Sequence, residues 1–171
     1  MENININKLP LIGKGTHGRV YRLDKNRCLK VCKKTKDMQM EYEVLKHVKG
    51  YSQFPRVYEC KANYMIREYV DGPNIKVYIK QNGFNNSLAR QLTELIRVFI
   101  KLKFTRIDIR MGELFVTSDH KLKIIDTTRY LDKKAPYPFK MLKVLKGLGY
   151  YKQYIKFLKE NYPDFYRAWT K

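Results

Sequence analysis

Three glycines lie within six residues near the start of this chain of 171 residues and limit the backbone structures that the segment can form. They stand in the run I-G-K-G-T-H-G-R-V-Y, which begins at Ile12. Glycine adopts backbone angles that other residues avoid, and its missing side chain lets other atoms approach the backbone closely. Short runs with apolar residues flank the glycines, at 9–12 and 19–23. We therefore expect a β-hairpin that turns at the glycine-rich run.

The same run matches the pattern G-x-G-x-x-G-x-V, which is typical of loops that fold over nucleotide phosphates. In such loops the backbone amides are open to phosphate oxygens. The pattern alone is weak evidence and more often marks a flexible turn. Here a lysine on a strand, an acidic helix and two late aspartates follow it in order. The candidates for phosphate contact are Gly13, Lys14, Gly15 and Gly18.

The lysine is Lys30, in a segment over 28–32 that the period-two alternation of its side chains predicts to be a strand. A helix is expected over 37–48, with the aspartate at its start as the cap. An ammonium that points into a nucleotide site balances phosphate charge and needs a carboxylate to hold it. Glu41 is the first candidate for that carboxylate, and Glu43 competes with it from a neighbouring side of the helix.

Further strands and helices are expected from periodicity and turn signals. Two more strands are predicted in the first seventy residues, which would then hold about five strands and one helix. The later part of the chain is predicted to be mostly helical, with one pair of short strands. We therefore expect an α+β fold in a single domain over 1–171, with a strand-rich lobe over 1–70 and a reduced helical lobe over 71–171. The predicted strands are 56–60, 63–69, 114–116 and 122–125, and the predicted helices are 87–103, 139–146 and 150–161.

Charge is the second strong feature of the sequence. Lys and Arg number 36 against 16 Asp and Glu, which gives a net charge of +20. The segment 133–171 is also strongly basic. Such a field favours an anionic partner, whether RNA, a ribosome, an acidic protein or an acidic membrane surface. The alternative is a lysine-rich composition that only keeps the surface solvated.

Several classes of protein are not indicated by the sequence. No run of about 18 apolar residues predicts a membrane span, and the first residues lack the pattern of a secretory signal. The three cysteines, Cys28, Cys32 and Cys60, form no metal-binding pattern and cannot all pair. We therefore expect a cytoplasmic protein with reduced thiols.

Over about residues 9–131 the ordered set resembles the protein-kinase superfamily. The resemblance implies a two-lobe fold that binds ATP with Mg²⁺ or Mn²⁺, with the glycine-rich hairpin over the phosphates. Lys30 in Cys28-Leu29-Lys30 is similar to the strand lysine that contacts the α and β phosphates, and Glu41 is similar to its helix partner. The residues that the resemblance places around the adenine are Glu68, Tyr69 and Val70 at the hinge, with Val20, Cys28 and Phe115 above and below the ring.

The later motifs resemble the catalytic and metal-binding parts of the family. The segment from Ile107 to Val116 is similar to the catalytic loop, which implies that Asp108 accepts or orients the proton of the substrate hydroxyl. Arg110 stands where serine/threonine kinases carry a lysine that neutralises the transferred phosphate. Asp126 matches the aspartate that holds the metal, and Glu113 stands at the position of the second metal ligand, usually asparagine.

Departures from the family pattern point to a reduced member. Thr127-Thr128 replaces Phe-Gly, and Ile107 replaces the arginine before the catalytic aspartate. Arg67 stands before the hinge, where the family has an apolar residue, and we expect it to pair with Glu41 or Asp126. Only 45 residues follow Asp126, so the peptide-docking half of an ordinary kinase is missing. The chain resembles the RIO kinases and the bacterial lipopolysaccharide kinases more closely than ordinary eukaryotic-type kinases.

The expected function is that of a minimal, atypical bacterial serine/threonine protein kinase that transfers the γ-phosphate of ATP to a hydroxyl group of a protein. Three alternatives remain open from the sequence. The first is a pseudokinase, which binds nucleotide as a regulatory module without turnover. The second is a basic RNA- or ribosome-binding protein on a kinase-like scaffold, and the third is a small-molecule phosphotransferase.

Overall fold

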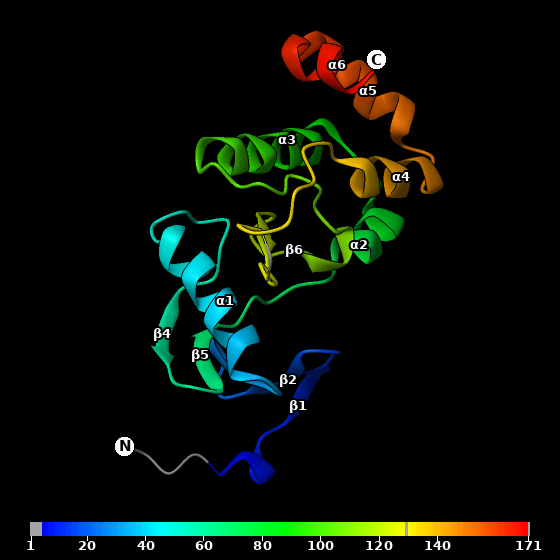
Figure 1. Cartoon of the computed structure of the whole chain (residues 1–171). Helices are drawn as coiled ribbons and strands as arrows, with labels where there is room; N and C mark the ends of the chain where they lie inside the picture. The colour runs from blue at the N-terminus through cyan, green and yellow to red at the C-terminus, as the bar shows by residue number, and fades with distance from the viewer. Residues whose placement is uncertain (1–4, 129, 171) are drawn as a thin grey trace. The chain divides into compact units, whose positions relative to one another are not determined.

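A computed structural model describes residues 5–128 and 130–170, which form an α+β fold (Figure 1). These residues contain a five-stranded antiparallel sheet, a two-stranded sheet and six α-helices. The α+β class and the five early strands are therefore confirmed. The described chain divides into two units, one formed by 5–70 with 125–128 and the other by 71–124 with 130–170.

The first unit is built on the five-stranded sheet, whose strand order is β1-β2-β3-β5-β4. A short 3-10 turn over Ile6–Lys8 precedes the sheet. Strand β3 lies in the middle, and Lys30 at its centre pairs with Val20 of β2 on one side and Met65 of β5 on the other. A lysine at this position therefore has sheet on both sides and little access to water. The strands are β1 (Leu11–Lys14), β2 (Gly18–Arg22), β3 (Arg27–Cys32), β4 (Val57–Cys60) and β5 (Tyr64–Glu68).

Helix α1 (Thr35–His47) is the helix of the first unit and packs against β3 and β4 (Figure 1). Its buried side chains recur every three to four residues, as expected for a helix with one face on a sheet. The expected cap was wrong. The N-cap is Lys34, which makes no side-chain cap bond, and Asp37 lies inside the first turn. The buried residues of α1 are Met38, Glu41, Val44 and Leu45.

The second unit is mainly helical and contains one pair of short antiparallel strands. The predicted strand pair and the predicted helices near 87–103, 139–146 and 150–161 are confirmed with shifted ends. Two helices, α2 and α6, were not predicted because both are short and lie beside turn or proline signals. The elements are α2 (Ile75–Asn82), α3 (Asn86–Lys101), a 3-10 turn (Met111–Glu113), β6 (Leu114–Val116), β7 (Leu122–Ile124), α4 (Phe139–Gly147), α5 (Tyr151–Asn161) and α6 (Pro163–Trp169).

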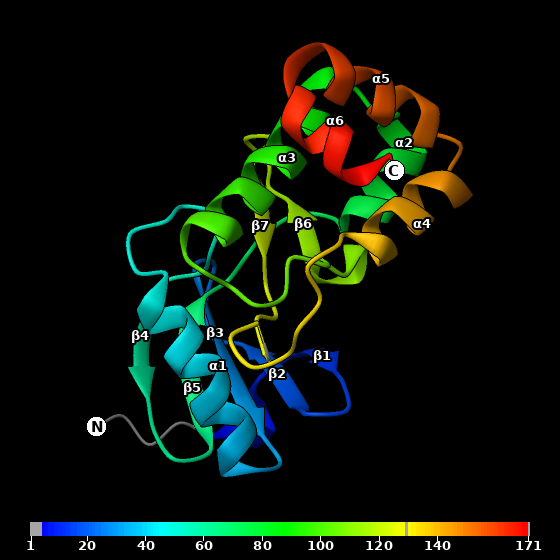
Figure 2. The same ribbon diagram turned by 45° about the horizontal axis from the view of Figure 1, so that its top comes forward.

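Helix α3 organises the core of the second unit. Figure 2 shows it beside β7, and it also contacts α5. Its apolar stripe is buried along its length, including Leu92, Leu95 and Phe99. The hydroxyls of Thr93 on α3 and Tyr154 on α5 lie 3.0 Å apart, which satisfies two buried polar groups within this core. No helix within the described ranges is long and apolar enough to cross a membrane.

Candidate functional site

Lys30 lies at the centre of the first unit, and its ammonium pairs with a buried carboxylate. Its side chain is 8% exposed, and Nζ donates a hydrogen bond to Glu41 of α1, whose side chain is 1% exposed. Glu43, the competing candidate, is 60% exposed and pairs with Lys46 on the surface. Buried charges are costly unless they are paired. The helix face that holds Met38 and Leu45 inside therefore also turns Glu41, and not Glu43, toward Lys30.

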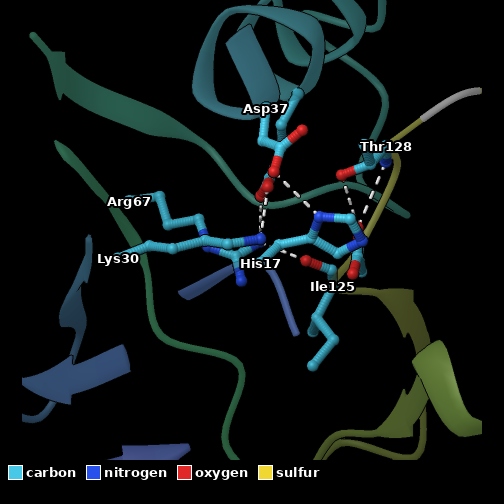
Figure 3. Close-up of polar contacts among 8 residues, drawn as sticks. His17, Lys30, Asp37, Arg67, Ile125 and Thr128 are labelled. Atoms are coloured by element: carbon cyan, nitrogen blue, oxygen red, sulfur yellow. Dashed lines mark hydrogen bonds and ion pairs between the residues drawn. The ribbon is translucent and has the colours of Figure 1, made fainter. Parts of the chain in front are cut away.

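Arg67 on β5 is a second cation beside the same carboxylate. Its side chain is 5% exposed, and Nη1 lies 3.5 Å from Oε1 of Glu41. The same nitrogen donates a hydrogen bond to the backbone carbonyl of Ile125 (Figure 3). Of the two partners expected for Arg67, Glu41 is thus found directly. On the side of Asp126, Arg67 bonds to the backbone carbonyl of the preceding residue, Ile125.

Asp126 follows β7 and belongs to the first unit with its neighbours. Its Oδ1 accepts hydrogen bonds from the backbone N–H of Thr128 at 3.1 Å and from the Thr128 hydroxyl at 2.9 Å. Burial by itself would raise the pKa of Asp126. The charge of Lys30, the two bonds from Thr128 and the charge of Arg67 outweigh burial, so the pKa lies below its usual value. Asp126 is therefore an ionised carboxylate at neutral pH.

The glycine-rich run forms the β1–β2 hairpin. Its three glycines differ in the space that a side chain would have at each position. A Cβ on Gly18 would lie 2.1 Å from the carbonyl oxygen of Val31, so the β2–β3 contact requires glycine there. A Cβ on Gly15 would meet nothing within 4 Å, and one on Gly13 would make only an ordinary contact with Val20. Lys14 ends β1 on the surface.

The tip of the hairpin is tied to α1. Nδ1 of His17 lies 2.9 Å from Oδ2 of Asp37, and the carbonyl of His17 accepts a hydrogen bond from the N–H of Lys33. Asp37 thus has a tertiary partner in place of the capping role that was expected for it. The two contacts hold the hairpin beside the start of α1, and Figure 3 shows the one between His17 and Asp37.

The segment expected to hold the adenine begins at Glu68, the last residue of β5, and continues to Val70. Oε2 of Glu68 accepts a hydrogen bond from the N–H of Arg56, and the N–H of Tyr69 donates to the carbonyl of Asn26. The guanidinium of Arg22 lies over the Tyr69 ring, 3.3 Å from its centroid. Val70 is buried. These contacts give the segment a defined conformation within the first unit.

Of the three residues expected around the adenine ring, two lie in the first unit. Val20 is half-buried on β2, and Cys28 is fully buried on β3, where Sγ lies 3.7 Å from the carbonyl oxygen of Glu68. Phe115 is half-buried on β6 of the second unit. Burial raises the pKa of the Cys28 thiol, which is free, as are Cys32 and Cys60. The thiol of Cys28 is thus a neutral, apolar surface.

Asp108 leads the cluster of the second unit. It is buried, and its Oδ1 accepts a hydrogen bond of 2.7 Å from the backbone N–H of Lys140, in the first turn of α4. Arg106, also buried, donates from Nε to the carbonyl oxygen of Asp108 at 3.2 Å. Asp108 is thus held from two sides, by a helix N-terminus at its carboxylate and by a guanidinium at its backbone.

Glu113 lies at the end of the 3-10 turn, among cations and a hydroxyl. Its Oε1 lies 3.2 Å from Nη1 of Arg110, and its Oε2 accepts a hydrogen bond of 2.8 Å from the hydroxyl of Tyr130. Nη2 of Arg106 lies 4.0 Å from the same Oε2. Arg106 also stacks on the Tyr130 ring, 4.5 Å from its centroid. The two residues expected to serve metal and phosphate, Glu113 and Arg110, therefore pair with each other here.

Three residues of this cluster were missed from the sequence. Nδ2 of Asn74 donates to the carbonyls of Met111, Gly112 and Leu114, at 3.0–3.2 Å. Its Oδ1 also caps α2, so a prediction of that helix would have drawn attention to Asn74. Arg106 and Tyr130 carry no local signal, because their roles depend on segments that meet only in the fold.

Two metal ligands are expected from the sequence. Asp126 belongs to the first unit and Glu113 to the second. Within 5–128 and 130–170, no three His, Cys, Asp or Glu side chains gather in a metal-binding group. Asp126 is a single ionised oxygen donor of the kind that Mg²⁺ takes together with substrate phosphates. Glu113 fits such a role only if Arg110 moves away from it.

No family model matches this chain, and no curated protein matches it. A function for this protein is therefore inferred from the geometry and charges of the candidate site residues in each of the two units.

Proposed function

We propose that this protein is an ATP-dependent phosphotransferase of the kinase type, which transfers the γ-phosphoryl group to a hydroxyl. The observation that carries the proposal is the buried pair of Lys30 and Glu41. A pair of this kind is weak evidence for stability, because a well-packed apolar pair often stabilises a core as well or better. Its presence between a central strand and α1, in the unit with the glycine hairpin and Asp126, is accounted for if Lys30 balances phosphate charge.

The proposal assigns nucleotide anchoring to the first unit. Gly13 and Gly15 are not required by contacts within the protein, which supports a role in admitting phosphate oxygens to the backbone. Lys30 would contact the phosphates while Glu41 keeps its ammonium in place. Asp126 would hold a magnesium ion carried by the ATP, which would neutralise phosphate charge.

Phosphoryl transfer is assigned to the second unit. Asp108 would orient the acceptor hydroxyl and receive its proton, while the new O–P bond forms and the bond between the γ-phosphorus and the bridging oxygen breaks to release ADP. Arg110, whose side chain is half exposed, would offset charge on the transferred group. The resemblance makes a serine or threonine of a protein the preferred acceptor.

A second candidate function is nucleotide binding without transfer. It is favoured by two contacts in the second unit: Asp108 receives the Lys140 amide, and Glu113 pairs with Arg110. Both carboxylates thus have partners within the protein that substitute for an acceptor hydroxyl and a metal ion. On this reading the first unit binds ATP as a regulatory ligand, and the second unit is structural.

Transfer of label from γ-labelled ATP tests the proposal, with Mg²⁺ and separately with Mn²⁺, for wild type and Asp108→Asn. Acceptors would be the protein itself, casein and a small alcohol, and labelled residues would be identified by mass spectrometry. Label that appears on serine or threonine and is lost in Asp108→Asn supports the kinase. ATP binding without label supports the regulatory module, and equal labelling by Asp108→Asn would refute the role of Asp108.

A further inference from the structure

Arg67 makes two contacts that the proposed chemistry does not require. It lies on β5 opposite Cys28 of β3, so its position is set by the centre of the sheet. From there the guanidinium reaches Glu41 on α1 and the backbone carbonyl of Ile125. One buried side chain thus joins three segments that are distant in the sequence: a strand, a helix and the segment 125–128.

The chemistry of arginine suits this position and that of lysine does not. A guanidinium is planar, presents several N–H donors in a fixed fork and keeps its charge when buried. Here the planar group fixes one nitrogen, Nη1, so that it faces both the Glu41 carboxylate and the Ile125 carbonyl. The ammonium of a lysine lies at the end of a flexible chain and is not fixed in this direction, and an apolar residue would leave the Ile125 carbonyl without this donor.

The charges near Arg67 explain why a second cation is tolerated there. Glu41 lies between Lys30 and Arg67, and the charges of both cations lower the pKa of Asp126. These four side chains carry two positive and two negative charges. Among the described residues, the Nε of Arg67 and Oε1 of Glu41 have no hydrogen-bond partner, so the arrangement depends on charge and on the contact to Ile125.

We infer that Arg67 is a positioning residue that clamps Glu41 and the segment 125–128 to the sheet, so that Lys30 and Asp126 are in place before nucleotide binds. Activation by a partner protein or by phosphorylation is then not needed to bring α1 to Lys30. The consequence for ATP rests on the proposed function. The clamp itself does not, since it concerns contacts within the first unit.

Arg67→Lys is the decisive variant, because it keeps the charge near Glu41 and removes the planar group that fixes Nη1 between Glu41 and the Ile125 carbonyl. Arg67→Gln is the second variant, which keeps a donor and removes the charge. Arg27→Lys is the matched control, since Arg27 lies on the neighbouring strand β3 with a half-exposed side chain that pairs with Asp24. Circular dichroism of each variant establishes that it is folded.

Hydrogen exchange without nucleotide measures the clamp directly. We expect the amides of 126–128 to exchange about tenfold faster in Arg67→Lys, as the loss of one buried hydrogen bond predicts. The amides at the centre of β3 should remain as in wild type, and Arg27→Lys should change neither region. Unchanged exchange at 126–128 in Arg67→Lys would overturn the inference, and so would equal acceleration throughout the first unit.

Binding of a fluorescent ATP analogue, titrated with Mg²⁺, measures the functional consequence. We expect Arg67→Lys to need several-fold more Mg²⁺ for half-maximal binding, with Arg27→Lys as wild type. If wild type binds no nucleotide, the proposed function fails, while exchange at 126–128 still decides the clamp. If both Arg67 variants fail to fold while Arg27→Lys folds, Arg67 has a general structural role and the inference is wrong.

Discussion

The carboxylate of Asp108 accepts a hydrogen bond from the backbone amide of Lys140, with 2.7 Å between Oδ1 and N. Helix α4 begins after Pro138, which supplies no side-chain acceptor for the free amides of the first turn. Asp108 supplies one from a segment 32 positions earlier in the chain. The residue that is proposed to serve the acceptor hydroxyl thus also caps a helix.

The two roles of Asp108 can be separated by substitution. Asp108→Asn keeps an oxygen that can accept from the Lys140 amide, so its melting temperature should stay near that of wild type. Phosphate transfer should fall by about 100-fold or more, because the amide cannot take a proton. Asp108→Ala should lose the cap as well, which costs about 1 kcal/mol of unfolding free energy. Equal destabilisation by both substitutions would contradict the capping role.

Glu41 and Glu43 provide a matched pair on α1. Glu41→Gln leaves Lys30 and Arg67 buried without a carboxylate between them, and should lower the unfolding free energy by about 3 kcal/mol. Glu43→Gln changes an exposed residue and should stay within about 0.5 kcal/mol of wild type. Urea unfolding followed by fluorescence measures both. A small effect for Glu41→Gln would show that the buried pair is not maintained in solution.

The lowered pKa of Asp126 predicts that the unfolding free energy decreases in acid. Its pKa in the folded protein lies below the ordinary value of 3.8, so the ionised form stabilises the fold at pH values above 3.8. This stabilisation is lost as the pH falls through 3.8 toward the lower pKa of the folded state. The stability difference between wild type and Asp126→Asn should therefore be constant near neutrality and shrink in acid. Asp164→Asn, on the surface, controls for net charge, and a difference independent of pH would contradict the expectation.

The hairpin glycines should respond differently to a methyl group. Gly18→Ala forces Cβ against the Val31 carbonyl and should destabilise the protein by about 2 kcal/mol. Gly15→Ala meets open space and should leave the melting temperature nearly unchanged. Under the proposed function, Gly15→Ala should still weaken ATP binding. Thermal melts and nucleotide titrations test the two effects, and a stable Gly18→Ala would argue against the β2–β3 contact.

Asn74 is predicted to hold the loop that follows Asp108. Asn74→Ala removes the donor to three carbonyls and the cap of α2, and should cost about 2 kcal/mol. Asn82→Ala, at the other end of α2, is the control because Asn82 contacts only its own helix among the described bonds. Exchange of the amides over 111–114 should accelerate only in Asn74→Ala. Equal acceleration in both variants would mean that α2 as a whole, rather than Asn74, holds the loop.

Much of the fold followed from local pattern. The strands near Lys30 and the long apolar stripe of α3 were predicted because alternation and helical spacing are repeated over several residues. The short helices α2 and α6 were missed, since eight and seven residues show too few turns for a clear period. Asp37 was predicted as a cap from residue type alone, but His17 approaches it from a distant hairpin.

The candidate site, like the fold, could be predicted from the sequence only in part. The order of the glycine run, Lys30, the acids of α1, Asp108 and Asp126 is a property of the sequence, and so is the net charge of +20. The choice of Glu41 over Glu43 was left open, and burial of one face of α1 decided it. The partners of Glu113 and Asp108 could not be read from the sequence. The distances from Glu113 and Asp108 to these partners depend on how the loop from Arg106, the segment at Tyr130 and the start of α4 pack together.

Residue type and short-range periodicity are local, so the identity and order of the chemical groups could be read from the chain alone. Burial depends on segments far apart in the chain, so the charges that are buried together are known only from the folded structure. Arg67 combines the two levels. Its place directly before Glu68 was visible in the sequence, whereas its contact with Ile125 exists only because β5 and the segment 125–128 meet in the folded unit.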